Sequence, residues 1–273
     1  MKRAVLWIIV FFALLAAMLF PLLLMAAPEE RQLSFAVQAG VVALTSVICQ
    51  LLRRRPLAEL TGALNGRWLR QLLAGCGLGA SLMLLPALFL RAIGAIHWQM
   101  VGGGFAIVVA ALPPAAAIVI AEELIFRGFI FQRLLDGFGE WPAQLVLAAY
   151  FVLTHSAALR DAGPLKTLAA VNIFIASLAF GLAYLRTRGL AMPLGLHFAA
   201  NVTQGPLLGF GVSGHADPSA SRVAFTDAPP WLTGGAFGLE ASVPGLVCVI
   251  ALAVLLYRVR PPLGNTMAST QHA

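Results

Sequence analysis

Charged residues are scarce in this sequence. Only 11% of its 273 residues are Asp, Glu, Lys or Arg, and 60% are hydrophobic. A soluble domain carries about 25% charged residues, so the composition excludes an ordinary soluble protein and indicates an integral membrane protein surrounded by a lipid bilayer. The richness in arginine and alanine favours a bacterial protein, which would lie in the inner (plasma) membrane.

Cysteine is also rare. Cys49, Cys76 and Cys248 all stand in apolar runs, and no two of them have a CxxC spacing. This pattern is typical of small core residues, and it excludes both a disulfide framework and a thiolate metal site.

Acidic residues are fewer than basic ones. The chain has 11 Asp and Glu against 18 Lys and Arg, which gives a net charge of +7. The basic residues stand in short loops between apolar runs, as the positive-inside rule requires, so we predict no nucleic-acid partner. With eight spans and the N-terminus inside, thirteen of the 18 basic residues fall on the inner side.

Long apolar runs dominate the chain and predict an all-α fold, a polytopic transmembrane helical bundle of about eight spans. The predicted spans are Ala4–Ala27, Leu33–Leu52, Leu72–Leu90, Val101–Leu135, Ala143–Ala158, Thr167–Leu185, Leu190–Gly211 and Val243–Tyr257. The first run is longer than the apolar core of a signal peptide, so we expect it to be retained. In the third, Gly75 and Gly79 form a small-xxx-small step that lets another helix approach closely.

The run from Val101 to Leu135 is too long for one straight span, and Pro113-Pro114 stand inside it. Two interpretations remain open. The run is either a bent fourth helix or a short segment that leads into a helix starting at Pro113, since proline fits the first turn of a helix.

Two adjacent carboxylates and an arginine stand inside this run, in the stretch Ala121–Gly128. Ionisable groups at membrane depth are costly, so they usually face the protein interior and mark a site. Glu123 and Arg127 are four residues apart on one helix face and can form an ion pair. Glu122 lies about 100° away around the helix, which leaves it free for chemistry.

Two of the five histidines lie within apolar runs, His155 in the fifth span and His197 in the seventh. His197 and Asn201 are four residues apart, so both point from one helix face. Three helices could therefore present Glu122, His155 and the His197–Asn201 pair to one buried pocket. A carboxylate and an imidazole can polarise a water molecule, and an imidazole and an amide can donate hydrogen bonds to an oxyanion.

The order of these residues resembles a known family. Glu122-Glu123 with Arg127 reads as EExxxR, Phe151 with His155 as FxxxH, and His197 with Asn201 as HxxxN. Together they are similar to the CAAX protease and bacteriocin-processing (CPBP, or Abi) family of intramembrane endopeptidases. The resemblance covers about residues 115–201 and implies a catalytic core at 101–212, after N-terminal transmembrane helices at 1–100. A loop at 213–240, a last transmembrane helix at 241–259 and a disordered tail at 260–273 would follow.

The resemblance also implies roles for the site residues. Glu122 would activate water with His155 as its partner, and His197 and Asn201 would stabilise the oxyanion. Glu123 and Arg127 would complete the catalytic set. The family has been described both as metalloproteases and as metal-independent glutamate proteases. The cofactor is therefore either none or zinc, with Glu122, His155 and His197 as candidate metal ligands.

Motifs of other intramembrane proteases are missing. The sequence has no HExxH and no GxGD motif. Gly211-Val212-Ser213-Gly214 matches the GxSG motif of rhomboid-like serine proteases, but those enzymes need a histidine on a later helix and the last span has none. We therefore interpret Ser213 as a turn residue. We predict an endopeptidase that cleaves membrane-associated proteins or peptides. The alternatives are a non-catalytic membrane scaffold and a transporter with Glu122 and His155 as a proton relay. The oligomeric state stays open.

Overall fold

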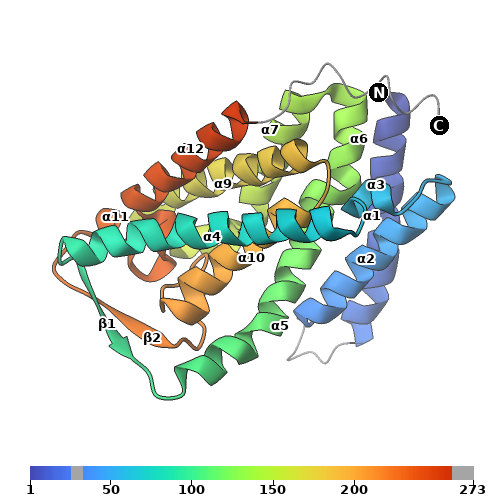
Figure 1. Cartoon of the computed structure of the whole chain (residues 1–273). Helices are drawn as coiled ribbons and strands as arrows, with labels where there is room; N and C mark the ends of the chain where they lie inside the picture. The colour runs from blue at the N-terminus through green and yellow to red at the C-terminus, as the bar shows by residue number, and fades with distance from the viewer. Residues whose placement is uncertain (26–32, 260–273) are drawn as a thin grey trace.

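The computed structural model describes residues 1–25 and 33–259, and this part of the chain is mostly helical (Figure 1). Its α-helices are α1 Lys2–Met25, α2 Phe35–Leu52, α3 Ala58–Thr61, α4 Gly66–Ala92, α5 Gly104–Glu123, α6 Phe129–Phe138, α7 Glu140–Thr154, α8 Ser156–Asp161, α9 Lys166–Thr187, α10 Ala191–Val202, α11 Pro230–Thr233 and α12 Val243–Arg258. The predicted retention of the first span and the predicted tail at 260–273 are not tested, and the tail lies outside the described residues.

Five helices of the described part are long and apolar enough to cross a membrane: Lys2–Met25, Phe35–Leu52, Ala58–Ala92, Gly104–Phe138 and Gly163–Thr187. The helix Val243–Arg258 is apolar but shorter. Two further predicted spans correspond to α7 and α10, which have 15 and 12 residues. The chain is therefore an integral membrane protein, and five full-length spans are seen where about eight were predicted.

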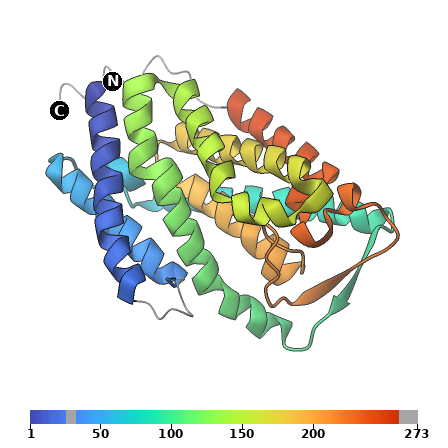
Figure 2. The same ribbon diagram turned by 180° about the vertical axis from the view of Figure 1, so that it is seen from behind.

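Pro113 and Pro114 do not start a helix, contrary to one of the two interpretations. The helix α5 begins at Gly104, runs through both prolines, and continues through the π-helical turn η1 (Leu124–Gly128) into α6. Figure 2 shows α5 and α6 as one path that changes direction between them. The ψ angle of −124° at Gly128 is far from helical, and π-turns are a common cause of helix bends.

The predicted close approach at Gly75 and Gly79 is confirmed, and the partner helix is α10. A Cβ atom on Gly79 would lie 2.0 Å from the carbonyl oxygen of Leu196, and one on Gly75 would lie 2.3 Å from that of Met192. Gly195 on α10 is equally close to the carbonyl oxygen of Leu72. The backbones of α4 and α10 therefore touch, which fixes the position of the helix that carries His197.

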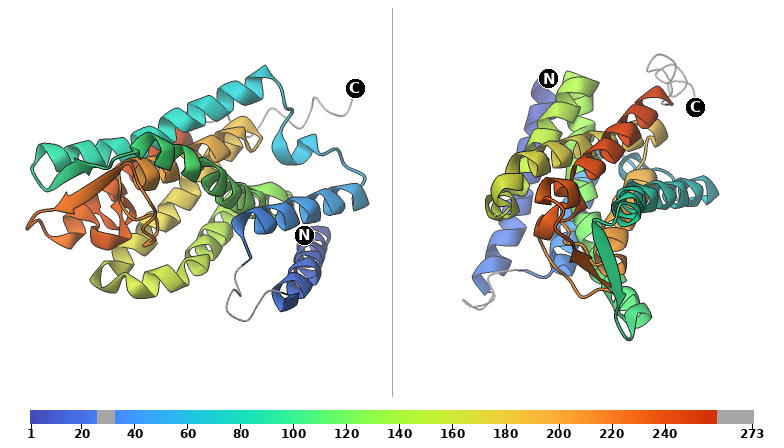
Figure 3. Two further views of the ribbon diagram at one scale, coloured as in Figure 1. Left: turned by 90° about the horizontal axis from the view of Figure 1, so that it is seen from below. Right: turned by 90° about the vertical axis from the view of Figure 1, so that its left-hand side faces the viewer.

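The prediction of a purely α-helical fold needs a correction. The strands β1 (Ile96–Met100) and β2 (Ser221–Phe225) pair antiparallel, with Ile96 opposite Phe225 and Met100 opposite Ser221. The segment 213–240, predicted as loop, thus contains a strand as well as α11. Figure 3 shows this ribbon at the end of the molecule opposite α1. The pairing joins segments far apart in sequence, and each strand has only five residues, so no local pattern predicted it.

Candidate active site

A cavity of about 510 Å³ lies between α5, α7, α9 and α10. Four of the predicted site residues, Glu122, His155, His197 and Asn201, line it together. They come from α5, the end of α7, and α10, so three helices that are separate in sequence bring these polar groups to one space. The rest of the lining is largely apolar, with Phe151, Ile173 and Phe180 among its members.

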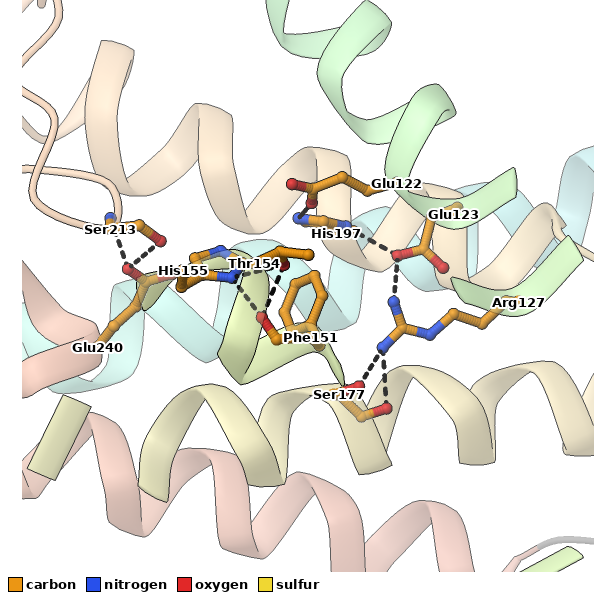
Figure 4. A network of polar contacts seen from close by, with 10 residues as sticks. All are labelled: Glu122, Glu123, Arg127, Phe151, Thr154, His155, Ser177, His197, Ser213 and Glu240. Atoms are coloured by element: carbon orange, nitrogen blue, oxygen red, sulfur yellow. Dashed lines mark hydrogen bonds and ion pairs between the residues drawn. The ribbon is translucent and has the colours of Figure 1, made fainter. Parts of the chain in front are cut away.

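The predicted ion pair between Glu123 and Arg127 is confirmed. The Arg127 Nη1 atom donates a hydrogen bond to Glu123 Oε1 at 3.1 Å, and both side chains are almost fully buried. The Arg127 Nη2 atom donates to the carbonyl oxygen and the hydroxyl group of Ser177 on α9, at 3.0 and 2.9 Å (Figure 4). The Phe151 and Phe180 rings lie on the guanidinium group, 5.2 and 5.1 Å from Cζ. Arg127 therefore joins α9 to the acidic motif from inside the protein.

His197 lies between the two glutamates. Its Nδ1 atom is 2.8 Å from Glu123 Oε1, and its Nε2 atom is 3.5 Å from Glu122 Oε2. An ionised carboxylate only accepts, so Nδ1 donates its proton to Glu123 and Nε2 faces Glu122 on the other side of the ring. Phe180 stacks on the ring, with centroids 4.8 Å apart and an angle of 26° between the planes.

The two glutamates differ in exposure. The Glu123 side chain is fully buried, whereas 28% of the Glu122 side chain is exposed and faces the cavity. Glu123 is held by two partners, Arg127 and His197, whereas within the described part of the chain Glu122 forms one ion-pair contact, with His197. The sequence-based expectation of one anchored and one available carboxylate agrees with this arrangement.

His155 lines the same cavity as Glu122, and no direct hydrogen bond or ion pair joins the two among the described residues. Its Nδ1 atom is 2.7 Å from the carbonyl oxygen of Phe151 and 3.4 Å from the Thr154 hydroxyl group. A carbonyl oxygen accepts only, so Nδ1 carries a proton, and in the neutral form of the ring Nε2 is an acceptor. The residue that contacts Glu122 is His197, because α10 rather than α7 lies against this face of α5.

Three polar or aromatic residues of α9 belong to the site but were not predicted: Asn172, Ser177 and Phe180. Asn172 lines the cavity, is 4% exposed, and its Nδ2 atom has no hydrogen-bond partner among the described residues. The only local signal was that Asn172 and Ser177 are polar residues within an apolar run. Ser213 lies in a turn and contacts Glu240 through its amide and hydroxyl groups, so its interpretation as a turn residue is confirmed.

Both motif helices end in a π-helical turn. The turn η1 directly follows Glu123, and the turn η3 (Thr203–Leu207) follows α10 shortly after Asn201. π-Turns inside helices occur frequently at functional sites, because the extra residue per turn re-aims the neighbouring side chains. The helix that carries the acidic pair and the helix that carries His197 are both reshaped next to the cavity.

The candidate zinc ligands Glu122, His155 and His197 do not form a metal-binding group. Among the described residues there is no group of three or more His, Cys, Asp or Glu side chains placed to hold a metal ion. The nitrogen atoms of His197 are directed at the two glutamates, and the Nδ1 atom of His155 at a backbone carbonyl. Zinc needs three protein ligands around one point, so this donor arrangement does not fit a zinc site.

The fold and the cavity together define a polytopic membrane protein with a buried carboxylate–imidazole site. Residues 102–203 match the family described as Type II CAAX prenyl endopeptidase Rce1-like. The match contains all six predicted site residues. The chain therefore carries a domain of the Rce1-like type II CAAX prenyl endopeptidase (CPBP/Abi) family, a family of peptide-bond hydrolases. Neither a curated protein nor a solved structure gives a significant match to the chain.

Proposed function

We propose that this protein is an intramembrane endopeptidase that hydrolyses peptide bonds of membrane-associated proteins or peptides without a metal ion. The observation that carries the proposal is the contact between Glu122 and His197 at the wall of a largely apolar cavity. On the side away from the cavity, His197 bonds to Glu123, which is paired with Arg127. A carboxylate at the wall of such a cavity is positioned to act on a water molecule next to a bound peptide.

The first step is activation of water. Glu122 accepts a proton from water as the oxygen attacks the peptide carbonyl carbon, and it later donates this proton to the leaving amine. The Nε2 acceptor of His155, on another wall of the same cavity, orients the water through its second hydrogen. His197 keeps Glu122 in place, and Glu123 accepts the hydrogen bond from Nδ1–H, which stabilises positive charge on the ring when Nε2 is also protonated.

The second step is stabilisation of the oxyanion that forms on the carbonyl oxygen. Asn201 lies one helical turn after His197 on α10 and lines the cavity with it. Its amide group can donate a hydrogen bond to this oxygen. The Nε2–H group of protonated His197 faces Glu122 at first, and it becomes a second donor for the oxyanion once Glu122 has taken the proton from water and is neutral. The close contact of α10 with α4 holds both donors in a fixed position.

The test is cleavage of a quenched fluorescent peptide by the purified protein in detergent. One peptide carries a prenylated cysteine as the fourth residue counted from its C-terminus. A second peptide of the same sequence carries an unmodified cysteine at this position. Glu122→Gln keeps the size of the side chain but cannot accept the proton, so the rate should fall by about 10³-fold or more. The control, Asp161→Asn, removes an exposed carboxylate at the end of α8 and should leave the rate unchanged.

The two peptides also test the substrate class. Cleavage of both supports a protease for membrane-associated peptides in general, and cleavage of the prenylated peptide alone narrows the class. If wild-type protein and Glu122→Gln cleave equally, the proposed catalytic role of Glu122 is wrong. Proton-coupled uptake into vesicles that needs Glu122, without any cleavage, would show that the pair serves transport instead.

A further inference from the structure

A second cavity, of about 420 Å³, shares no lining residue with the cavity that Glu122 faces and is formed by other helices. Its lining comes from the start of α1, the end of α2 with the residue after it, and α6. The helices α1 and α6 are packed closely there, because a Cβ atom on Gly137 would lie 2.6 Å from Ala4 Cβ. Figures 1 and 2 both show α1 beside α6 at this end of the molecule.

The polar side chains of this cavity are mostly arginines. Arg3, Arg53 and Arg133 line it together with one acid, Asp136, so its side-chain charge is +2 (three arginines minus one aspartate). The Arg53 and Arg133 guanidinium groups lie against the same ring, that of Phe129, at 5.7 and 5.4 Å from its centroid. Both positive charges therefore lie beside one ring, and an anion bound next to them would offset their repulsion.

The acidic side chains nearby balance these charges only in part. Asp136 contacts Arg133 at 3.2 Å, but 63% of its side chain is exposed. Glu59 is 3.8 Å from Arg53 and also contacts Arg55 at 3.5 Å, so its charge is divided. Burial lowers the pKa of the Arg53 guanidinium group below its ordinary value, although Glu59 and Asp136 oppose the effect.

Arg133 supplies the observation that points to a ligand. Its side chain is 7% exposed, and its Nε atom has no hydrogen-bond partner among the described residues. A buried guanidinium with an unused donor, in a cavity with two further arginines, offers several N–H groups to one anion. Phosphate oxygens match guanidinium donors in geometry and charge.

We infer that this cavity binds a phosphate group, and that the phosphate belongs to the headgroup of an anionic phospholipid. The apolar part of the lining, Ala4, Trp7 and Leu52, belongs to helices that are long and apolar enough to span the membrane. Tryptophan is enriched at the membrane–water interface, and basic pockets between transmembrane helices bind anionic headgroups. The arginines also lie on the side that the positive-inside rule predicts to be cytoplasmic.

The experiment measures binding of dioleoyl phosphatidylglycerol, dioleoyl phosphatidylcholine and inorganic phosphate to the full chain in neutral detergent by native mass spectrometry. Phosphatidylglycerol should bind at least about fivefold more tightly than phosphatidylcholine. Arg3→Gln and Arg53→Gln should each weaken phosphatidylglycerol binding by about fivefold, the equivalent of about 1 kcal/mol for one basic residue near a lipid headgroup. The matched control, Arg70→Gln, removes an exposed arginine of α4 outside the cavity and should change binding less than twofold.

A variant that is expected to increase lipid affinity separates an effect on binding from damage to the fold. Asp136→Asn removes the acid from the cavity lining, so it should tighten phosphatidylglycerol binding, which a misfolded protein would not do. Equal binding of both lipids would contradict the proposed site. An equal loss of phosphatidylglycerol affinity in Arg70→Gln and Arg53→Gln would contradict it too. Saturation by inorganic phosphate without competition from phosphatidylglycerol would overturn the lipid assignment.

Discussion

The helices α9 and α1 are both long and apolar enough to cross a membrane, but they lie in opposite surroundings. In the span that contains α9, 61% of the most apolar window is buried inside the protein, against 11% for α1. The helix α9 supplies Asn172, Ser177 and Phe180 to the site, whereas α1 leaves side chains such as Phe20, which is 63% exposed, on the outside of the protein. Apolar composition places a helix in the membrane, and only its packing shows whether it faces protein or lipid.

The same contrast exists within single helices. On α4, the faces of Gly75 and Gly79 touch the backbone of α10, whereas a Cβ atom on Gly77 would meet nothing within 4 Å. The physical difference is packing density, because a protein neighbour cannot move aside as a lipid chain can. Substitutions on the interior face should therefore have large effects, and matched ones on the lipid or water face should have small effects.

The largest effect on stability should come from Arg127→Ala. The change leaves Glu123 buried without its cation and removes both bonds to Ser177, so we expect a loss of about 3–5 kcal/mol in the free energy of unfolding. Chemical unfolding in mixed micelles measures this loss. Arg70→Ala, at an exposed position of α4, should cost less than about 0.5 kcal/mol. A stable but inactive Arg127→Ala protein would instead indicate direct participation in catalysis.

The next largest effect should be on the rate of peptide cleavage in His197→Gln. Glutamine keeps one donor next to the glutamates, so we expect a loss of about 10²–10³-fold, as for one oxyanion donor, with measurable residual activity. The control is His97→Gln, at an exposed position of β1. Activity that disappears with a chelator and returns with added zinc would overturn the metal-independent proposal.

A smaller effect is expected from Gly79→Ala. The new methyl group would lie 2.0 Å from the Leu196 carbonyl oxygen, so α10 must shift, at a cost of about 1–3 kcal/mol in stability. Because α10 carries His197 and Asn201, the cleavage rate should fall as well. Gly77→Ala meets open space and should be neutral or should stabilise the helix slightly. Equal effects of the two variants in thermal unfolding would refute the close packing of α4 and α10.

The smallest effect is expected from Ser177→Ala. The hydroxyl bond to Arg127 is lost but the bond to the Ser177 carbonyl oxygen remains, so the free energy of unfolding should fall by about 1–2 kcal/mol. Ser81→Ala is the matched change on the exposed side of α4, where the hydroxyl group bonds to the Gly77 carbonyl oxygen of its own helix, and it should be nearly neutral. A cost in Ser177→Ala no greater than in Ser81→Ala would show that α9 contributes little through this bond.

Local spacing predicted part of the site well. The pair Glu123–Arg127 was readable because residues four apart in a helix face the same side, and the structure contains this pair. The same argument placed His197 and Asn201 on one wall of the cavity. Such contacts depend only on helical geometry, which a sequence pattern encodes directly. The partner of Glu122 was not readable in this way, because it comes from a different helix.

The sequence by itself determined that this protein lies in a membrane, which seven residues form its motifs, and which of the two glutamates is paired with Arg127. Tertiary structure decided that His197 rather than His155 contacts Glu122, that α9 supplies Ser177 to Arg127, and that Arg53 and Arg133 meet at the ring of Phe129. Hydropathy and helical periodicity are properties of neighbouring residues. Contacts between helices depend on which faces pack together, and here the backbone contact at Gly75, Gly79 and Gly195 fixes that choice for α10.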